Sequence, residues 1–280
     1  MTDPLITDPP GGPGPRAATV PLTFDSAGTR LLGILHVPAG PGPHPVLILL
    51  HGFPGNERNF DLAHAASRAG YATLVFHYRG SWGMGGSWSW AHLMEDAAAA
   101  VAAVRDPATA AAHGLDPGRL DPGRLALIGH SAGGFTALMT AAALPEVAAA
   151  GSLAGFDFGA AAAACRADPA AATAYEQAWR EELLPLSGTS AAALVAEMLE
   201  AGEAWRLSGL AGPLAGRPVL LVGAGRDTVA PPDVHHRPLV EAYGRSSLLD
   251  HHLLDTDHAL ADHRVALART VIGFLDRRLR

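Results

Sequence analysis

The sequence contains a single cysteine, Cys165, among its 280 residues, so the chain cannot form an intrachain disulfide bond. It also begins without the basic segment and apolar core of a secretory signal peptide, because Asp3, Asp8 and several prolines occupy that stretch. These two absences predict a protein of the cytoplasm.

No apolar run approaches the ~20 residues that a membrane-spanning helix requires. Positive charge is scarce as well: 20 Lys and Arg residues stand against 27 Asp and Glu residues, which gives a net charge of −7, and the basic residues form no cluster. Binding to nucleic acid or to an anionic membrane normally depends on a basic patch. We therefore expect no nucleic acid and no membrane as partner, and the sequence leaves open whether the chain forms a homo-oligomer.

Hydrophobic residues make up 49% of the chain, which is enough for one sizeable core. Residues 1–18 are rich in proline and glycine and can neither donate enough backbone hydrogen bonds nor bury enough surface, so they are predicted to be a disordered tail. Two β-type runs follow at 20–24 and 30–37. The turn-forming residues between them indicate an antiparallel hairpin.

Beyond the hairpin, strand and helix patterns alternate, which predicts an α/β protein with a doubly wound, mostly parallel sheet. The run 46–50 has no polar alternation, as expected for a strand covered on both faces. A tandem repeat, 115–120 and 121–125, is expected to lengthen a surface loop. Further strands are expected at 72–78, 125–128, 147–153, 218–222 and 247–254, and helices at 59–69, 91–104, 132–143, 233–243 and 262–279.

The alternation is interrupted between residues 157 and 214, which contain no convincing strand. Helical patterns occur there around 173–184 and 190–203. We therefore predict a helical cap, 157–214, inserted into a core made of residues 19–156 and 215–280.

A serine stands at the junction of the run 125–128 and the helix predicted at 132–143. The residues Gly129-His130-Ser131-Ala132-Gly133 form a G-x-S-x-G motif, in which the glycines allow a sharp strand-to-helix turn that exposes the serine. The motif alone is weak in a chain with 32 glycines, but its position between a strand and a helix is the context that supports it. Ser131 is therefore the candidate nucleophile.

A serine hydroxyl needs a base, and the base needs an acid to orient it. In a parallel sheet such groups gather at the carboxyl ends of the strands. Asp227 follows the apolar run 219–222 in a short loop before a helix, which is the expected place for the acid. Asp157 is the rival candidate, and Asp250 lies within an expected strand.

His258 lies beyond the last expected strand, in a loop before the final helix, and is the candidate base. The other histidines are less well placed. His251 and His252 lie inside an expected strand, and His235, His236 and His263 lie in expected helices. His130 is next to the candidate nucleophile, and His51 precedes a loop glycine.

Negative charge that develops on a carbonyl oxygen needs two fixed donors. The backbone N–H of Ala132, at the start of the helix, is the first candidate. The second comes from the loop after the strand 46–50, where we choose the N–H of Phe53, because Pro54 has none to donate.

Large aromatic residues on the glycine-rich loop after strand 72–78 are candidates for a substrate pocket. Trp82, Trp88 and Trp90 would form an apolar wall there, although packing under the cap explains them equally well. Phe156, Phe158, Trp179 and Trp205 are expected either in the core or as lining.

The combination of His51-Gly52-Phe53, the motif around Ser131, Gly225-Arg226-Asp227 and His258 resembles the α/β-hydrolase superfamily over roughly residues 20–280. The chain order Ser, Asp, His agrees with this family. The stretch 76–83 with Glu95-Asp96 further resembles its branch of serine esterases, dienelactone-hydrolase-like proteins and prolyl-oligopeptidase-like peptidases.

This resemblance implies hydrolysis of an ester, thioester or amide, without a metal or organic cofactor. The chain lacks the N-terminal propeller of oligopeptidases and the HGGG oxyanion loop of many lipases. We therefore expect a carboxylesterase acting on small or medium acyl groups, with a serine peptidase, amidase or thioesterase as the alternative. A non-hydrolytic binding protein or a lyase on the same fold stays open.

Overall fold

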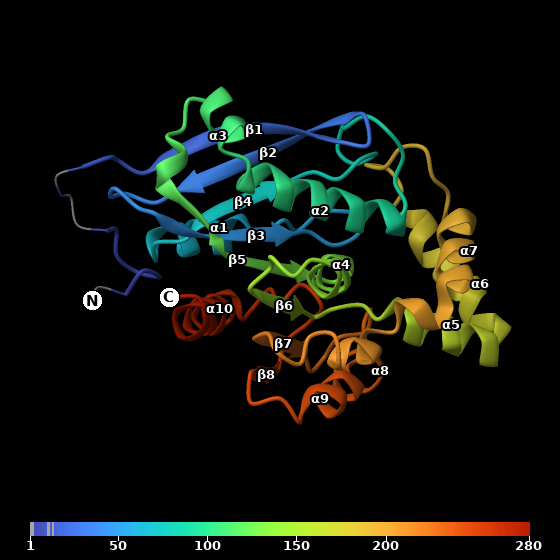
Figure 1. Cartoon of the computed structure of the whole chain (residues 1–280). Coiled ribbons are helices and arrows are strands. Elements are labelled where there is room, and N and C mark those ends of the chain that lie inside the picture. Colours follow the sequence, from blue (N-terminus) through green and yellow to red (C-terminus); the bar gives the residue numbers. More distant parts are fainter. Residues whose placement is uncertain (1–2, 10–11, 13) are drawn as a thin grey trace.

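The structure is a computed structural model that describes residues 3–9, 12 and 14–280. Within these residues the chain forms one eight-stranded sheet in the order β1-β2-β4-β3-β5-β6-β7-β8 (Figure 1). The first pairings, β1 with β2 and β2 with β4, are antiparallel, and the others are parallel. The strands are β1 Ala18–Ser26, β2 Thr29–Val37, β3 His44–Leu50, β4 Ala72–Phe76, β5 Leu120–His130, β6 Ala149–Leu153, β7 Val219–Ala224 and β8 Leu249–Leu254.

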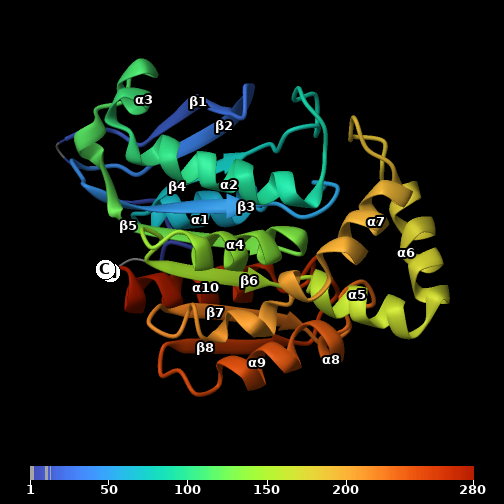
Figure 2. The same cartoon turned by 45° about the vertical axis from the view of Figure 1, so that its right-hand side comes forward.

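Helices cover both faces of this sheet (Figures 1 and 2). One core lies between the sheet and helices α1 and α10, and a larger core lies between the sheet and helices α2 and α4. The prediction of a doubly wound, mostly parallel sheet with an N-terminal hairpin is confirmed. The helices are α1 Phe60–Arg68, α2 Trp90–Arg105, α3 Pro107–Ala112, α4 Ala132–Ala143, α5 Phe158–Ala167, α6 Pro169–Glu181, α7 Ala191–Ala201, α8 Pro232–His235, α9 Arg237–Tyr243 and α10 Arg264–Arg278, with 3-10 turns η1 Pro117–Arg119, η2 Gly202–Trp205 and η3 Leu207–Ala211.

The central strand β3 is buried on both faces from Pro45 to Leu50, which explains its unbroken apolar sequence. The hairpin turns at Ala27 and Gly28, both with positive φ, and the Gly28 N–H donates to the Asp25 carboxylate. Two consecutive residues with positive φ are typical of tight hairpin turns.

The segment between β6 and β7 is helical and extends to one side of the sheet, at the right of Figures 1 and 2. It contains α5, which the sequence pattern did not predict, in addition to α6 and α7. Asp157 begins α5 by accepting a hydrogen bond from the Ala160 N–H at 2.9 Å. We keep the name cap for residues 157–214.

The structure corrects two further expectations. The tandem repeat is only in part a surface loop, because Leu120 of the first copy and Asp121 and Leu125 of the second pair with β3, whereas residues 122–124 bulge out. The helix predicted at 233–243 is divided into α8 and α9.

Part of the predicted N-terminal tail makes contacts. The Arg68 side chain donates to the Pro4 carbonyl oxygen at 2.7 Å, and Arg269 pairs with Asp3 at 3.3 Å. Residues 1–2, 10–11 and 13 of the tail lie outside the described residues. Among the helices of the described part, none is both long enough and apolar enough to cross a membrane.

Candidate active site

Ser131 occupies the single residue between β5 and α4. Its backbone has φ 55° and ψ −122°, a conformation that costs energy for any residue with a side chain. The turn is held from both sides, because the Ser131 N–H donates to the Leu153 carbonyl at 2.9 Å and the Ser131 carbonyl accepts from the Gly134 N–H at 2.9 Å. The sequence prediction of a sharp strand-to-helix turn at Ser131 agrees with this geometry.

The glycines of the motif are required by close backbone contacts. A Cβ atom on Gly129 would lie 2.0 Å from the Gly133 carbonyl oxygen, and one on Gly133 would lie 2.1 Å from the Leu50 carbonyl oxygen. No side chain fits at either distance. The turn can therefore close on itself only because Gly129 lacks a side chain, and it can pack against β3 only because Gly133 lacks one.

Asp227 and His258 are in direct contact. Asp227 lies in the loop after β7 and His258 in the loop after β8, and the His258 Nδ1 is 2.6 Å from the Asp227 Oδ2. The other carboxylate oxygen of Asp227 accepts from the N–H groups of Val229 and Ala230, both at 2.8 Å. The Asp227 side chain is fully buried, so this carboxylate has a fixed orientation.

The electrostatics of this pair favour an ionised carboxylate. Burial would raise the pKa of Asp227, but the hydrogen bond and charge of His258, together with the amides of Ala230 and Val229, lower that pKa below its ordinary value. A carboxylate can only accept, so the Nδ1 of His258 donates. The Nε2 of a neutral His258 is then left as an acceptor for a proton.

The other candidate acids do not contact His258. Asp157 caps α5, and its second oxygen accepts from the Leu207 N–H at 3.2 Å. Burial raises the pKa of Asp157 above its ordinary value. Asp250, on β8, pairs with arginines of α10.

His130 has a contact that the sequence did not reveal. Its Nε2 donates to the backbone carbonyl oxygen of His258 at 2.7 Å, which fixes the loop that carries His258. Burial, followed by the nearby His258, lowers the pKa of His130 to about 3, so its ring is neutral at physiological pH. Because sequence spacing does not show which loop lies beside a given side chain, no sequence signal could have found this contact.

The loop after β3 lies next to the serine turn. A Cβ atom on Gly52 would lie 3.0 Å from the carbonyl oxygen of His130. The Nδ1 of His51 donates to the Gly52 carbonyl oxygen at 2.8 Å. In a trans peptide the N–H points opposite to the C=O, so this bond directs the Phe53 N–H away from the His51 ring.

A cavity of about 660 Å³ is bordered by Phe53, Ser131, Ala132 and His258. The structure therefore brings the predicted nucleophile, base and both oxyanion donors to one cavity, with Asp227 behind His258. Six aromatic residues line it among smaller and polar ones: Phe53, Trp90, Phe156, Phe158, Tyr175 and Trp179.

Only one of the three predicted pocket tryptophans lines this cavity. Trp90 lines the cavity. Trp88 is fully buried, and its ring packs against that of Phe53 with centroids 6.0 Å apart. Trp82 is 40% exposed and lies on the outer side of the loop, where its Nε1 donates to the Pro54 carbonyl at 3.0 Å. Trp82 and Trp88 are not among the residues that line this cavity, and the burial of Trp88 agrees with the alternative that these tryptophans serve packing.

Besides Trp179, helix α6 supplies lining residues that the sequence did not single out. Ala171, Ala174, Tyr175, Ala178 and Trp179 recur at helical spacing and face the cavity together. This spacing is the signal that could have found them.

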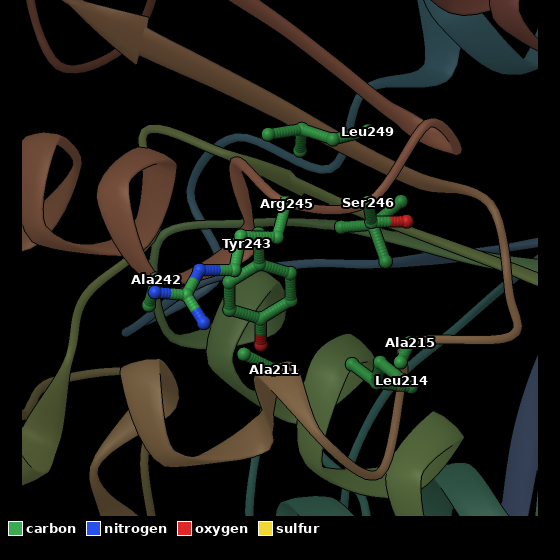
Figure 3. A pocket seen from close by; sticks show the side chains of 9 residues that line it. Ala211, Leu214, Ala215, Ala242, Tyr243, Arg245, Ser246 and Leu249 are labelled. Atoms are coloured by element: carbon green, nitrogen blue, oxygen red, sulfur yellow. The ribbon is translucent and has the colours of Figure 1, made fainter.

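A smaller hollow of about 160 Å³ lies elsewhere, beside η3 and the segment between α9 and β8 (Figure 3). Its wall includes Tyr243, whose hydroxyl donates to the Leu207 carbonyl at 2.9 Å, and Arg245. None of the predicted site residues borders it, and we assign it no role. Within the described residues, no three His, Cys, Asp or Glu side chains gather closely enough to hold a metal ion.

Comparison with solved structures shows what the fold resembles. An esterase of Pyrococcus furiosus matches with a TM-score of 0.66 at 18% identity, over 98% of each chain. Est1E of Butyrivibrio proteoclasticus matches with a TM-score of 0.65 at 18% identity, over 92% of this chain and 98% of its own. An acylaminoacyl peptidase of Pyrococcus horikoshii matches with a TM-score of 0.66 at 15% identity, over 94% of this chain and 42% of its own.

A search of curated proteins found no significant sequence match. The family model described as "Alpha/beta hydrolase family", however, matches residues 47–270, a range that includes the serine turn and the loops of Asp227 and His258. The match spans most of the chain, and the strand order and the turn at Ser131 agree with it. This chain belongs to the alpha/beta hydrolase family.

Proposed function

We propose that the chain is a serine hydrolase that cleaves carboxylic esters of small or medium acyl groups through an acyl-enzyme on Ser131. The observation that supports this most directly is the 2.6 Å contact between His258 and the buried Asp227, beside the cavity that Ser131 borders. A binding protein has no need for a base oriented in this way next to a strained serine.

The proposed reaction begins when His258 takes the proton of the Ser131 hydroxyl as its oxygen attacks the ester carbonyl carbon. The resulting oxyanion accepts hydrogen bonds from the N–H groups of Phe53 and Ala132. His258 then gives its proton to the departing alcohol. A water molecule, deprotonated by His258, attacks the acyl-enzyme, and the carboxylic acid leaves as Ser131 regains its proton.

The choice of substrate follows from the cavity. A volume of about 660 Å³ lined by six aromatic residues and several alanines suits a small or medium apolar acyl group, because these side chains contribute binding by burying apolar surface. We propose that the cap, residues 157–214, closes this cavity, since Phe158, Tyr175 and Trp179 all come from it. The proposed partner is thus a small-molecule ester, and the cytoplasm is the proposed location.

The alternatives use the same residues. A peptidase or amidase would follow the same steps with an amine as leaving group. The similarity of the fold to that of an acylaminoacyl peptidase supports this alternative. A thioesterase would release a thiol. A non-hydrolytic binding protein or a lyase would not form an acyl-enzyme.

A fluorophosphonate probe tests the proposal. We expect a covalent adduct on Ser131, located by peptide mass spectrometry, and none in the Ser131→Ala variant. Folded protein without an adduct would overturn the proposal. Nitrophenyl esters of increasing acyl length, aminoacyl anilides and acyl thioesters assayed in parallel then separate esterase, peptidase and thioesterase.

A further inference from the structure

Glu197, on helix α7 of the cap, holds the first turn of α2. Its two carboxylate oxygens accept from the backbone N–H groups of Trp90 at 2.9 Å and Ala91 at 2.8 Å. The next free amide of α2, that of His92, is satisfied by the Ser89 side chain at 3.1 Å. Helix N-termini favour a negative charge, and here that charge comes from another helix more than 100 positions along the chain.

Trp90 is tied to the same helix by its side chain. The indole Nε1 donates to the Leu194 carbonyl oxygen at 3.0 Å, and the residue is only 1% exposed. Three hydrogen bonds therefore connect Trp90 and Ala91 to one turn of α7. They fix both the backbone and the ring plane of Trp90.

The ring of Trp90, held in this way, packs against other aromatic rings of the cavity wall. Its centroid lies 5.3 Å from that of Phe53 and 5.1 Å from that of Trp179, in edge-to-face packing. All three rings border the cavity beside Ser131. A displaced Trp90 would therefore change the acyl wall of the cavity.

We infer that Glu197 is a positioning residue that sets acyl-chain selectivity, because it holds Trp90 in the wall of the cavity. This inference rests on the proposed esterase function. Glu197 touches neither the proposed catalytic residues nor the cavity, and it acts through Trp90.

The variant Glu197→Gln keeps the side-chain length but replaces one acceptor oxygen with a donor group that faces a backbone N–H. Glu200→Gln is the matched control, since Glu200 is exposed on the same helix. Both are compared with the native chain by kcat and KM on nitrophenyl esters from acetate to octanoate. The variant Glu197→Ala removes both hydrogen bonds. If Glu197→Ala fails to fold, Glu197→Gln still tests the inference.

We expect Glu197→Gln to raise KM for the hexanoate and octanoate esters about fivefold or more, while kcat and KM for acetate change less than threefold. Glu200→Gln should keep the native profile. A Glu197→Gln profile parallel to the native one, or a uniform loss at every chain length, would overturn the inference.

A second measurement does not depend on turnover. Hydrogen exchange at residues 89–92 should be faster in Glu197→Gln than in the native chain and in Glu200→Gln. Octanoate, whose binding is followed by tryptophan fluorescence, should bind more weakly to Glu197→Gln than to either of these proteins. If the native chain hydrolyses no ester and takes no fluorophosphonate, the proposed function fails. The exchange and octanoate data then still decide whether Glu197 positions Trp90, and unchanged values would refute it.

Discussion

Gly52 lies so close to Ser131 that a Cβ atom on Gly52 would stand 2.8 Å from the Cβ atom of Ser131. The backbone of the loop after β3 therefore approaches Ser131 so closely that no side chain fits on Gly52. Because Gly52 lies this close to Ser131, the N–H of the next residue, Phe53, can donate a hydrogen bond to the carbonyl oxygen of a substrate bound at Ser131.

Replacing Gly52 with alanine should separate the two segments. Overpacking of this kind costs about 1–3 kcal/mol of stability. Displacement of one oxyanion donor lowers kcat about 10²-fold or more. Thermal melting and ester hydrolysis measure the two effects. Gly209→Ala is the control, because a Cβ there has nothing within 4 Å. Native kcat in a folded Gly52→Ala variant would exclude this loop from the oxyanion site.

Asp227→Asn should abolish most activity without unfolding the protein. An amide can still accept from the N–H groups of Val229 and Ala230, but it cannot stabilise a positive charge on His258. By analogy with the same change in other catalytic triads, kcat should fall about 10⁴-fold. The control is Asp250→Asn on β8, which should keep native kcat. An Asp227→Asn variant with more than a tenth of native activity would remove Asp227 from the proposed mechanism.

Stability should fall in mild acid because several histidines are buried without charge, and His51 and His130 have the lowest pKa values among them. Burial is the first cause that lowers the pKa values of His51 and His130 to about 3, whereas the unfolded chain titrates near pH 6.5. The unfolded state binds more protons between these values. Stability is therefore fully present above pH ~6.5 and is lost as the pH falls toward the folded pKa, by about 2 kcal/mol per histidine at pH 5.

Urea unfolding of the native chain and of His130→Gln at pH 7.5 and pH 5 measures this effect. The variant should lose about 2 kcal/mol less between the two pH values, since it lacks one of these groups. His251→Gln, at an exposed position of β8, serves as control and should keep the native pH dependence. Equal pH dependence in all three proteins would contradict the assignment.

The buried ion pair of Arg79 and Asp96 should contribute strongly to stability. The fully buried carboxylate of Asp96 accepts from the Arg79 side chain at 2.6 Å, the Arg79 N–H at 2.8 Å and the Ser26 hydroxyl at 2.6 Å. Removing one partner of a buried pair costs about 3–5 kcal/mol. We expect that loss for Asp96→Asn in urea unfolding. Glu95→Gln is the comparison, since Glu95 contacts the same arginine but is 56% exposed, and it should cost less than about 1 kcal/mol. Similar losses in both variants would contradict this account.

Local patterns predicted much of the fold and the approximate positions of the site residues. Helix α4 begins where its sequence predicts, at 132, because the turn at Ser131 requires the adjacent glycines, and it also ends at the predicted residue, 143. Asp227 and His258 were chosen because they follow strands, and in the structure they are in contact. Strand ends of a parallel sheet meet at one edge, so that part of the geometry follows from topology.

The tryptophan loop could not be predicted because its path depends on residues distant in sequence. The Trp82 N–H donates to the Pro185 carbonyl at 2.8 Å, and the Trp88 N–H donates to the Ser187 carbonyl at 2.9 Å. These bonds turn Trp82 outward and Trp88 inward. Helix α5 is absent from the sequence prediction because Asp157, which fits the pattern of a catalytic acid, is instead the residue that caps this helix.

Strand β8 lies at the edge of the sheet and is the last strand to be synthesised. The ribosome releases Ser131 well before the loop that carries His258, and domains generally fold as units. A nascent chain would thus display its proposed nucleophile without a base. Under the proposed mechanism, chemistry in the cell would begin only when the final strand has joined the sheet.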